Sequence, residues 1–107
     1  MTETCMIYGT ASSPEEGRLI ARTLVAEKLV ACVNLIDGAT AVYRWEGAVE
    51  EATETLFIAK TTKALSSEAL TRIQALHSYE VPCAVVYDMA GGLPTYLAWI
   101  AAEAKGR

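Results

Sequence analysis

The sequence has few of the residues that most catalytic and metal-binding sites need. It has one histidine, His77, and three cysteines, Cys5, Cys32 and Cys83, which are far apart and flanked by apolar residues. An odd number of widely spaced cysteines in apolar segments is typical of reduced, buried thiols and not of a disulfide scaffold. The chain also lacks a Gly-x-Ser-x-Gly elbow and a His-Glu-x-x-His motif, so we expect that it is not an enzyme.

Positive charge and long apolar runs are also scarce. Nine Lys and Arg stand against 13 Asp and Glu, for a formal net charge of -4, and no basic patch is interleaved with aromatic residues. We therefore expect no nucleic-acid partner. No apolar run reaches the ~20 residues of a membrane span, and Met1 to Thr4 contain no basic residue. We expect no membrane partner, no leader segment and a cytoplasmic location.

What the sequence does have is enough apolar residues for one domain with a substantial core. Its 107 residues are 52% hydrophobic and 21% charged, which predicts a single domain over residues 1–107. The run from Thr4 to Thr10 and the run from Cys83 to Tyr87 read as short strands, the second beginning only after Pro82 because proline cannot donate to a sheet.

The spacing of apolar residues predicts three helices. Ser13-Pro14-Glu15-Glu16 places a hydroxyl at the N-cap, a proline at the first helical position and a carboxylate three residues after the serine, the reciprocal capping arrangement of a helix start. Apolar residues three and four apart mark the buried stripe of each helix. These stripes are Ile20, Ala21, Leu24, Val25 and Leu29, then Leu65, Ala69, Leu70, Ile73 and Leu76, and finally Leu93, Leu97, Ile100 and Ala104.

Between the first two helices the sequence predicts a long β-hairpin, Ala31 to Trp45 and Val49 to Thr61, which turns at Trp45-Glu46-Gly47. Fifteen extended residues span about 50 Å, whereas a compact chain of this length has a radius of gyration of roughly 13 Å. The hairpin must therefore bend or overhang. An overhanging two-stranded ribbon is marginally stable alone in water, so we expect other subunits to complete it.

The predicted order of strand, helix, strand, strand, helix, strand, helix gives the fold class. It is α+β, a ferredoxin-like split βαβ sandwich with two helices on one face of an antiparallel sheet, an extended hairpin and an extra C-terminal helix. The other sheet face would be bare and apolar, which favours a homo-oligomer. The predicted interface residues are Tyr43, Trp45, Glu46 and Val49 on the hairpin and Trp99 on the last helix.

Five sequence motifs in order resemble the divalent-cation tolerance (CutA) family. They are Ala31-Cys32-Val33-Asn34-Leu35-Ile36, Tyr43-Arg44-Trp45-Glu46-Gly47, Lys60-Thr61-Thr62, His77-Ser78-Tyr79-Glu80-Val81-Pro82 and Tyr96-Leu97-Ala98-Trp99-Ile100. The resemblance covers nearly the whole chain. It implies a ferredoxin-like fold, a homotrimer, cytoplasmic residence in bacteria and an association with tolerance to copper and other divalent metals.

The resemblance also suggests where a metal would bind. The candidate ligands are His77, Glu80 and Cys83, with Tyr79 beside them and carboxylates of Glu50, Glu51 or Glu54 from a neighbouring hairpin. The chain departs from the family pattern at Ser78, where a proline is usual, and at Cys83, where an acid is common. The structural alternative is that His77 caps its helix, Tyr79 packs under it, Glu80 pairs across the trimer and Cys83 is a small buried hydrophobe.

Two functions are therefore expected. The first is a non-catalytic trimer that handles or senses divalent metal, with copper or another divalent cation as its possible ligand and no certain cofactor. The alternative is a trimeric regulatory sensor that binds a small ligand in the clefts between subunits, like the nitrogen-regulatory trimeric proteins. The short turn at Glu46-Gly47 favours the first, since such sensors carry a long flexible loop.

Overall fold

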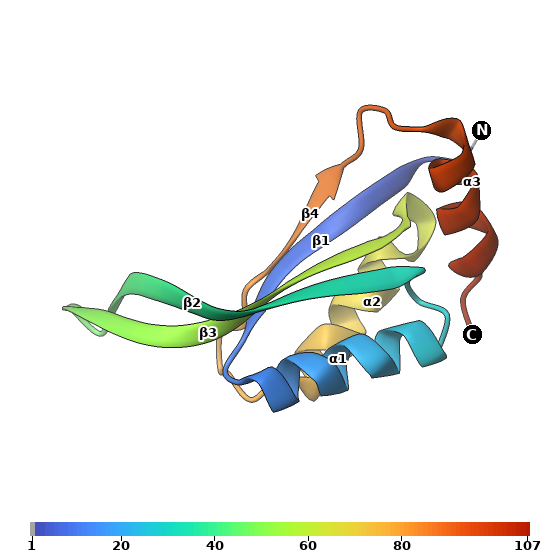
Figure 1. The fold of residues 1–107 in the computed structure, drawn as a ribbon. Helices are drawn as coiled ribbons and strands as arrows, with labels where there is room; N and C mark the ends of the chain where they lie inside the picture. The colour runs from blue at the N-terminus through green and yellow to red at the C-terminus, as the bar shows by residue number, and fades with distance from the viewer. Residues whose placement is uncertain (1) are drawn as a thin grey trace.

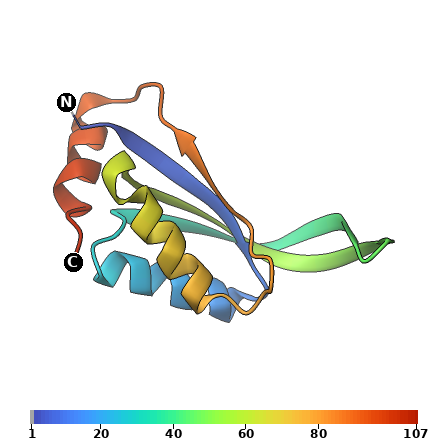
Figure 2. The ribbon, with the colours of Figure 1, turned by 180° about the vertical axis from the view of Figure 1, so that it is seen from behind.

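The computed structural model describes residues 2–107 and confirms the predicted α+β fold. Four strands and three helices follow one another in the expected order: β1 Thr4–Ala11, α1 Pro14–Ala26, β2 Cys32–Trp45, β3 Ala48–Thr62, α2 Lys63–Leu76, β4 Ala84–Asp88 and α3 Pro94–Glu103. The sheet order is β2-β3-β1-β4 and every pairing is antiparallel. Helices α1 and α2 cover one face of the sheet, and α3 lies at the end opposite the hairpin tip (Figures 1 and 2).

The start of α1 is close to the predicted capping arrangement. Ser13 is the N-cap, its Oγ accepts a hydrogen bond from the Glu16 amide at 3.1 Å, and Pro14 takes the first helical position. The carboxylate of Glu16, however, accepts from the amide of Ser12 at 2.9 Å. The reciprocal bond to Ser13 that a capping box requires is therefore replaced by a bond one residue earlier.

Two members of the predicted stripe of α1 behave differently from the expectation. Val25 is 42% exposed, because it lies about 100° around the helix from the buried Leu24. The helix ends at Ala26, and Lys28 takes a positive φ of 61°. Leu29 is fully buried, but it belongs to the connection into β2 and not to the helix.

The core lies between the sheet and the two covering helices. Phe57, the only phenylalanine, is fully buried at its centre with Ile7, Ile20, Leu24 and Ile73. Gly9 on β1 leaves room for that ring: a Cβ at Gly9 would lie 2.2 Å from Phe57 Cζ and 2.8 Å from the carbonyl oxygen of Cys83. A side chain at position 9 and the observed position of Phe57 are incompatible.

The hairpin overhangs the domain, as the sequence predicts. The chain measures 46 × 26 × 21 Å with a Cα radius of gyration of 14.3 Å, and β2 and β3 project beyond the helices (Figure 1). The tip turns through Glu46 at φ 49° and Gly47 at φ 83°, two consecutive left-handed residues, as a type I′ hairpin turn requires.

A β-bulge interrupts β2 in the middle of the hairpin. Ile36 pairs with Leu56 and Ala39 pairs with Glu54, so Asp37 and Gly38 together oppose the single residue Thr55. Gly38 takes φ 78°. The carboxylate of Asp37 holds the bulge, since Oδ1 accepts from Thr55 Oγ1 at 3.1 Å and Oδ2 lies 3.3 Å from the guanidinium of Arg18. A bulge bends a strand and shifts its alternation by one residue, so it decides which hairpin side chains face the sheet's open side.

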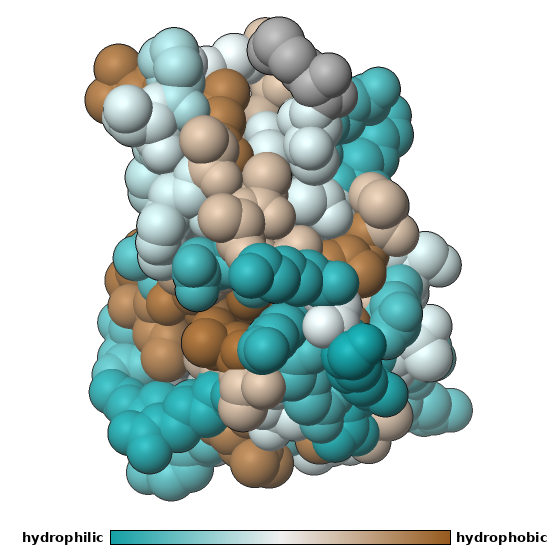
Figure 3. All heavy atoms as spheres, turned by 90° about the vertical axis from the view of Figure 1, so that its right-hand side faces the viewer, coloured by the Kyte–Doolittle hydropathy of each residue, from teal (hydrophilic) through white to brown (hydrophobic). Residues whose placement is uncertain are grey.

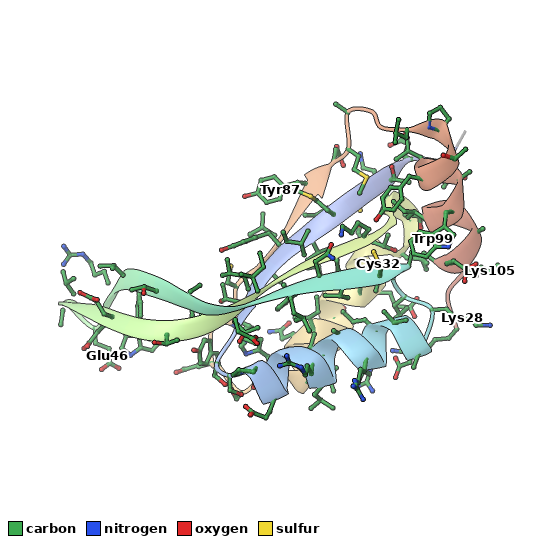
Figure 4. All side chains as sticks on the ribbon, in the orientation of Figure 1. Lys28, Cys32, Glu46, Tyr87, Trp99 and Lys105 are labelled. Atoms are coloured by element: carbon green, nitrogen blue, oxygen red, sulfur yellow. The ribbon has the colours of Figure 1, made fainter. Side chains whose placement is uncertain are left out.

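The sheet face opposite the helices carries exposed apolar side chains. Ile36 is 50% exposed, Val85 46% and Tyr87 50%, and Tyr87 projects away from the helices (Figure 4). Strand β4 begins at Ala84, one residue after the predicted start at Cys83. This exposed apolar face agrees with the expectation that a single chain leaves it uncovered.

Helix α3 packs on its own chain through Ile100 and Ala104, which are buried with Ala31. Leu93, predicted to belong to its stripe, is 75% exposed, because it is the N-cap residue and its side chain precedes the first turn. Beyond α3, the Gly106 amide donates to the Lys28 carbonyl at 2.9 Å. Hydrophobic side chains gather at mid-height on this end of the molecule, bordered by hydrophilic ones (Figure 3).

Within residues 2–107, no helix is long and apolar enough to cross a bilayer.

Candidate functional site

The base of the hairpin and the loop between α2 and β4 meet on the open side of the sheet. The Tyr79 hydroxyl donates to Glu54 Oε2 at 3.0 Å and thereby joins the loop to β3. Burial, and then the hydrogen bond and charge of Glu54, raise the pKa of Tyr79 to about 12. Tyr79 therefore stays protonated over the whole physiological range and donates this hydrogen bond to Glu54.

His77 lies beneath this loop with both ring nitrogens in use. Its side chain is fully buried. Nδ1 accepts from the backbone amide of Tyr79 at 3.1 Å, and Nε2 lies 2.6 Å from the carbonyl oxygen of Thr10. A carbonyl can only accept and an amide can only donate, so the two bonds make Nε2 the donor and Nδ1 the acceptor.

Glu16 ties the same loop to the start of α1. Its Oε1 accepts from the Ser12 amide and hydroxyl at 2.9 and 3.0 Å, and its Oε2 accepts from the Ser78 amide at 2.9 Å. Burial alone would raise the pKa of this carboxyl, but the hydrogen bonds from Ser12 and Ser78 outweigh burial and lower it. Glu16 is therefore an ionised acceptor that holds Ser78 in place.

Above these anchors lies a hollow of about 410 Å³. Its wall combines hairpin residues, one residue of β1 and the loop that follows α2. The lining residues are Thr10, Ala41, Tyr43, Trp45, Glu54, Tyr79, Glu80, Val81 and Cys83.

The bulge in β2 accounts for the aromatic part of this wall. Because Ala39 pairs with Glu54 beyond the bulge, residues 41, 43 and 45 share a sheet face with Glu54. Tyr43 and Trp45 therefore point toward the loop. Without the extra residue at positions 37 and 38, Val42 and Arg44 would take that face.

The three predicted metal ligands are only partly brought together. Glu80 and Cys83 line the hollow, whereas His77 does not. Burial, followed by the charge of Glu54, raises the pKa of the Cys83 thiol, and the neutral thiol is a poor metal ligand. Among residues 2–107, no group of three or more His, Cys, Asp and Glu side chains is placed to hold a metal ion. The side chains of one chain do not fit a dedicated metal centre.

The acidic residues suggested for a metal site lie at different places on the hairpin. Glu54 reaches the Tyr79 loop within its own chain, whereas the sequence suggested a carboxylate from a neighbouring hairpin. Glu51, opposite Val42, lies on the other face of the hairpin.

Two residues near the site, Thr10 and Asp37, were not predicted from the sequence. Asp37-Gly38 is a turn-type pair inside a strand, and it was the signal that could have revealed the bulge.

The predicted interface residues are exposed in the single chain. Tyr43 is 43% exposed, Trp45 42%, Val49 67% and Trp99 42%. Glu46 occupies the hairpin tip, and Trp99 lies at the far end of the molecule (Figure 4). Trp99 stacks on Tyr96, with ring centroids 5.7 Å apart. Tyr43 and Trp45 have a second role, since they line the hollow.

The fold and the sequence place this chain among known proteins. Residues 5–103 match the family described as CutA1 divalent ion tolerance protein. The chain belongs to the CutA1 family. The divalent-cation tolerance protein CutA of Thermus thermophilus is 43% identical over 100 residues, which cover 94% of this chain and 95% of that protein. These matches confirm the resemblance seen in the sequence.

Other CutA proteins extend the comparison. A crystal structure described as the periplasmic divalent cation tolerance protein CutA from Archaeoglobus fulgidus superposes with a TM-score of 0.92 at 37% identity and covers 95% of this chain and 99% of its own. The chloroplastic protein CutA of Arabidopsis thaliana is 38% identical over 95 residues, 89% of this chain but only 52% of that protein's length. CutA proteins are thus named from more than one compartment, and the names of the Thermus and Archaeoglobus proteins describe a divalent-cation tolerance role.

Proposed function

We propose that this CutA1 chain acts in divalent-cation tolerance as a non-catalytic homotrimer of the cytoplasm. The observation that carries the proposal is the combination of an overhanging hairpin with an exposed apolar sheet face. Val42 and Val49 on the hairpin are 64% and 67% exposed, and Ile36, Val85 and Tyr87 expose about half of their surface on the sheet. Exposed apolar area on this scale favours burial against sister chains.

The unpaired strand edges also favour association with sister chains. In the sheet order β2-β3-β1-β4, the outer strands β2 and β4 each have one edge without a partner in residues 2–107. Unpaired edges are templates for further strand pairing. Trp45 and Trp99 would supply large anchors at two ends of such an interface, since tryptophan is enriched where subunits bury it.

Metal, with copper as the candidate, is proposed to act on the assembled trimer and not through a built centre in one chain. The nitrogens of His77 are both hydrogen-bonded, so His77 could ligate only if the loop at Tyr79 opened. Glu80 and Cys83 face the hollow and would need donors from a neighbouring subunit to complete a coordination shell.

The oligomeric state is the first test. Light scattering and sedimentation of the full chain at micromolar concentration are expected to give three times the mass of one 11.5 kDa chain. A folded single-chain particle at that concentration would contradict the trimer and every proposal that needs clefts between subunits. A Val49→Lys variant should shift the mass toward smaller species, whereas Leu19→Lys, a change at an equally apolar exposed residue of α1, is the matched control.

The alternative is a regulatory sensor that binds a small ligand. The observation that favours it is the 410 Å³ hollow, which falls in the size range of small-molecule sites. A thermal-shift screen with nucleotides, carboxylates and divalent metals separates the two functions. Stabilisation by metals alone supports metal handling, and stabilisation by one organic class alone supports the sensor.

A further inference from the structure

The hollow at the base of the hairpin has walls suited to a positive charge. Tyr43 and Trp45 from β2 and Tyr79 from the loop after α2 all line it. The face of an aromatic ring carries negative electrostatic potential and attracts cations, most strongly for tryptophan. Three such rings from two separate segments converge on one space.

The charged side chains of the hollow have the complementary sign. Glu54 and Glu80 line it, and none of its described lining residues is Lys, Arg or His. Glu54 Oε2 accepts from Tyr79, which fixes the carboxylate against the loop. Within residues 2–107, Oε1 of Glu54 accepts no hydrogen bond, so that oxygen remains available to a ligand.

The same wall disfavours a bare metal ion. A metal ion needs several donors at short, fixed distances, and no group of three candidate ligands is assembled within residues 2–107. Ala41 and Val81 add apolar surface to the same wall. A cation that carries its own apolar groups would satisfy both the carboxylate and the rings.

We propose that this hollow binds a small organic ammonium ion, alkylated at nitrogen, with the charged group beside Glu54 and its alkyl groups against the aromatic rings. All the lining residues belong to one chain, so the inference does not rest on the role in metal tolerance. It requires that the hollow stay open in the proposed trimer, with Tyr43 and Trp45 only partly covered by a sister chain. Recognition combines cation–π attraction with charge pairing, and both weaken if the positive charge is removed from the ligand.

Calorimetric titration of the full-length, assembled protein with choline tests the proposal. The control ligand is 3,3-dimethylbutan-1-ol, which has the shape of choline with carbon in place of the charged nitrogen. Saturable binding of choline is expected, with the neutral analogue about tenfold weaker or more. Equal binding of the two ligands would overturn the proposal. So would no binding of choline, which is the result if a sister chain fills the hollow in the assembly.

Matched variants locate the site. Glu54→Gln removes the charge inside the hollow, and we expect at least about a tenfold loss of choline affinity. Glu51→Gln removes the same charge from the opposite face of the hairpin and is expected to leave affinity unchanged. Equal effects of the two variants would show that choline responds only to net charge and would overturn the assignment.

Fluorescence gives a second readout. The chain has two tryptophans, so Trp99→Phe leaves Trp45 as the only reporter. Choline should quench or shift the emission of this variant with the same affinity that calorimetry gives. Binding without any change at Trp45 would place the ligand elsewhere and contradict the proposal.

Discussion

The hydroxyl of Tyr79 donates a hydrogen bond to Glu54 Oε2 at 3.0 Å and so fastens the loop after α2 to the base of the hairpin. The two residues are 25 positions apart in the sequence. This one bond orders the wall of the hollow, because Tyr79 and Glu54 both line it.

Tyr79→Phe is expected to lower the free energy of unfolding by about 1.5 kcal/mol, since a hydrogen bond to a charged acceptor is lost while the ring is kept. Urea denaturation at neutral pH measures the difference. Tyr87→Phe removes the same hydroxyl from a half-exposed side chain on the open sheet face and should change stability little. Equal losses of unfolding free energy in the two variants would show that the hydrogen bond to Glu54 does not account for the effect of Tyr79→Phe.

The same pair predicts how stability depends on alkaline pH. The pKa of Tyr79 is raised from 10.0 to about 12, so the folded state holds this proton more tightly than the unfolded state. The stabilisation from Tyr79 is therefore complete below pH 10 and is lost as pH rises toward 12. The stability difference between the unmodified chain and Tyr79→Phe should shrink across that window. A difference that stays constant to pH 12 would contradict the raised pKa.

Gly9→Ala is expected to destabilise the fold by about 2 kcal/mol or more, because the new methyl group would overpack the core. The added carbon would meet Phe57 at 2.2 Å and the backbone of Cys83 at 2.8 Å. Gly91→Ala is the matched control, since nothing lies within 4 Å of its added carbon, and it should stay within about 0.5 kcal/mol. Thermal unfolding of the two variants makes the comparison, and unchanged stability of Gly9→Ala would show that Phe57 can move aside.

Copper titration tests the predicted metal ligands. Because both nitrogens of His77 are hydrogen-bonded, we expect His77→Ala to bind copper with the stoichiometry of the unmodified chain, measured calorimetrically on chelator-treated protein. Lost stoichiometric binding would establish His77 as a ligand and show that the loop opens to admit the metal. Glu80→Gln and Cys83→Ser apply the same test to the other two candidates.

The metal-site prediction shows where sequence reasoning reaches its limit. The motif around His77 identifies a loop with ligand-type residues, but a motif contains no information on what each nitrogen is bonded to. The partner of His77 Nε2 is the carbonyl of Thr10, 67 positions away. Only the packing of the loop on β1 decides that the histidine is engaged.

The elements themselves were determined by the sequence alone, because they depend on interactions within a few residues. Ser13 and Pro14 set the start of α1, Gly47 allowed the tight turn, and the length of the two apolar runs required an overhanging hairpin. The tertiary structure decided which side chains meet. The bulge at Asp37 and Gly38 turned Tyr43 and Trp45 toward the loop, and Gly9 made room for Phe57. Such contacts depend on strand register and core packing over the whole chain, and no local pattern specifies them.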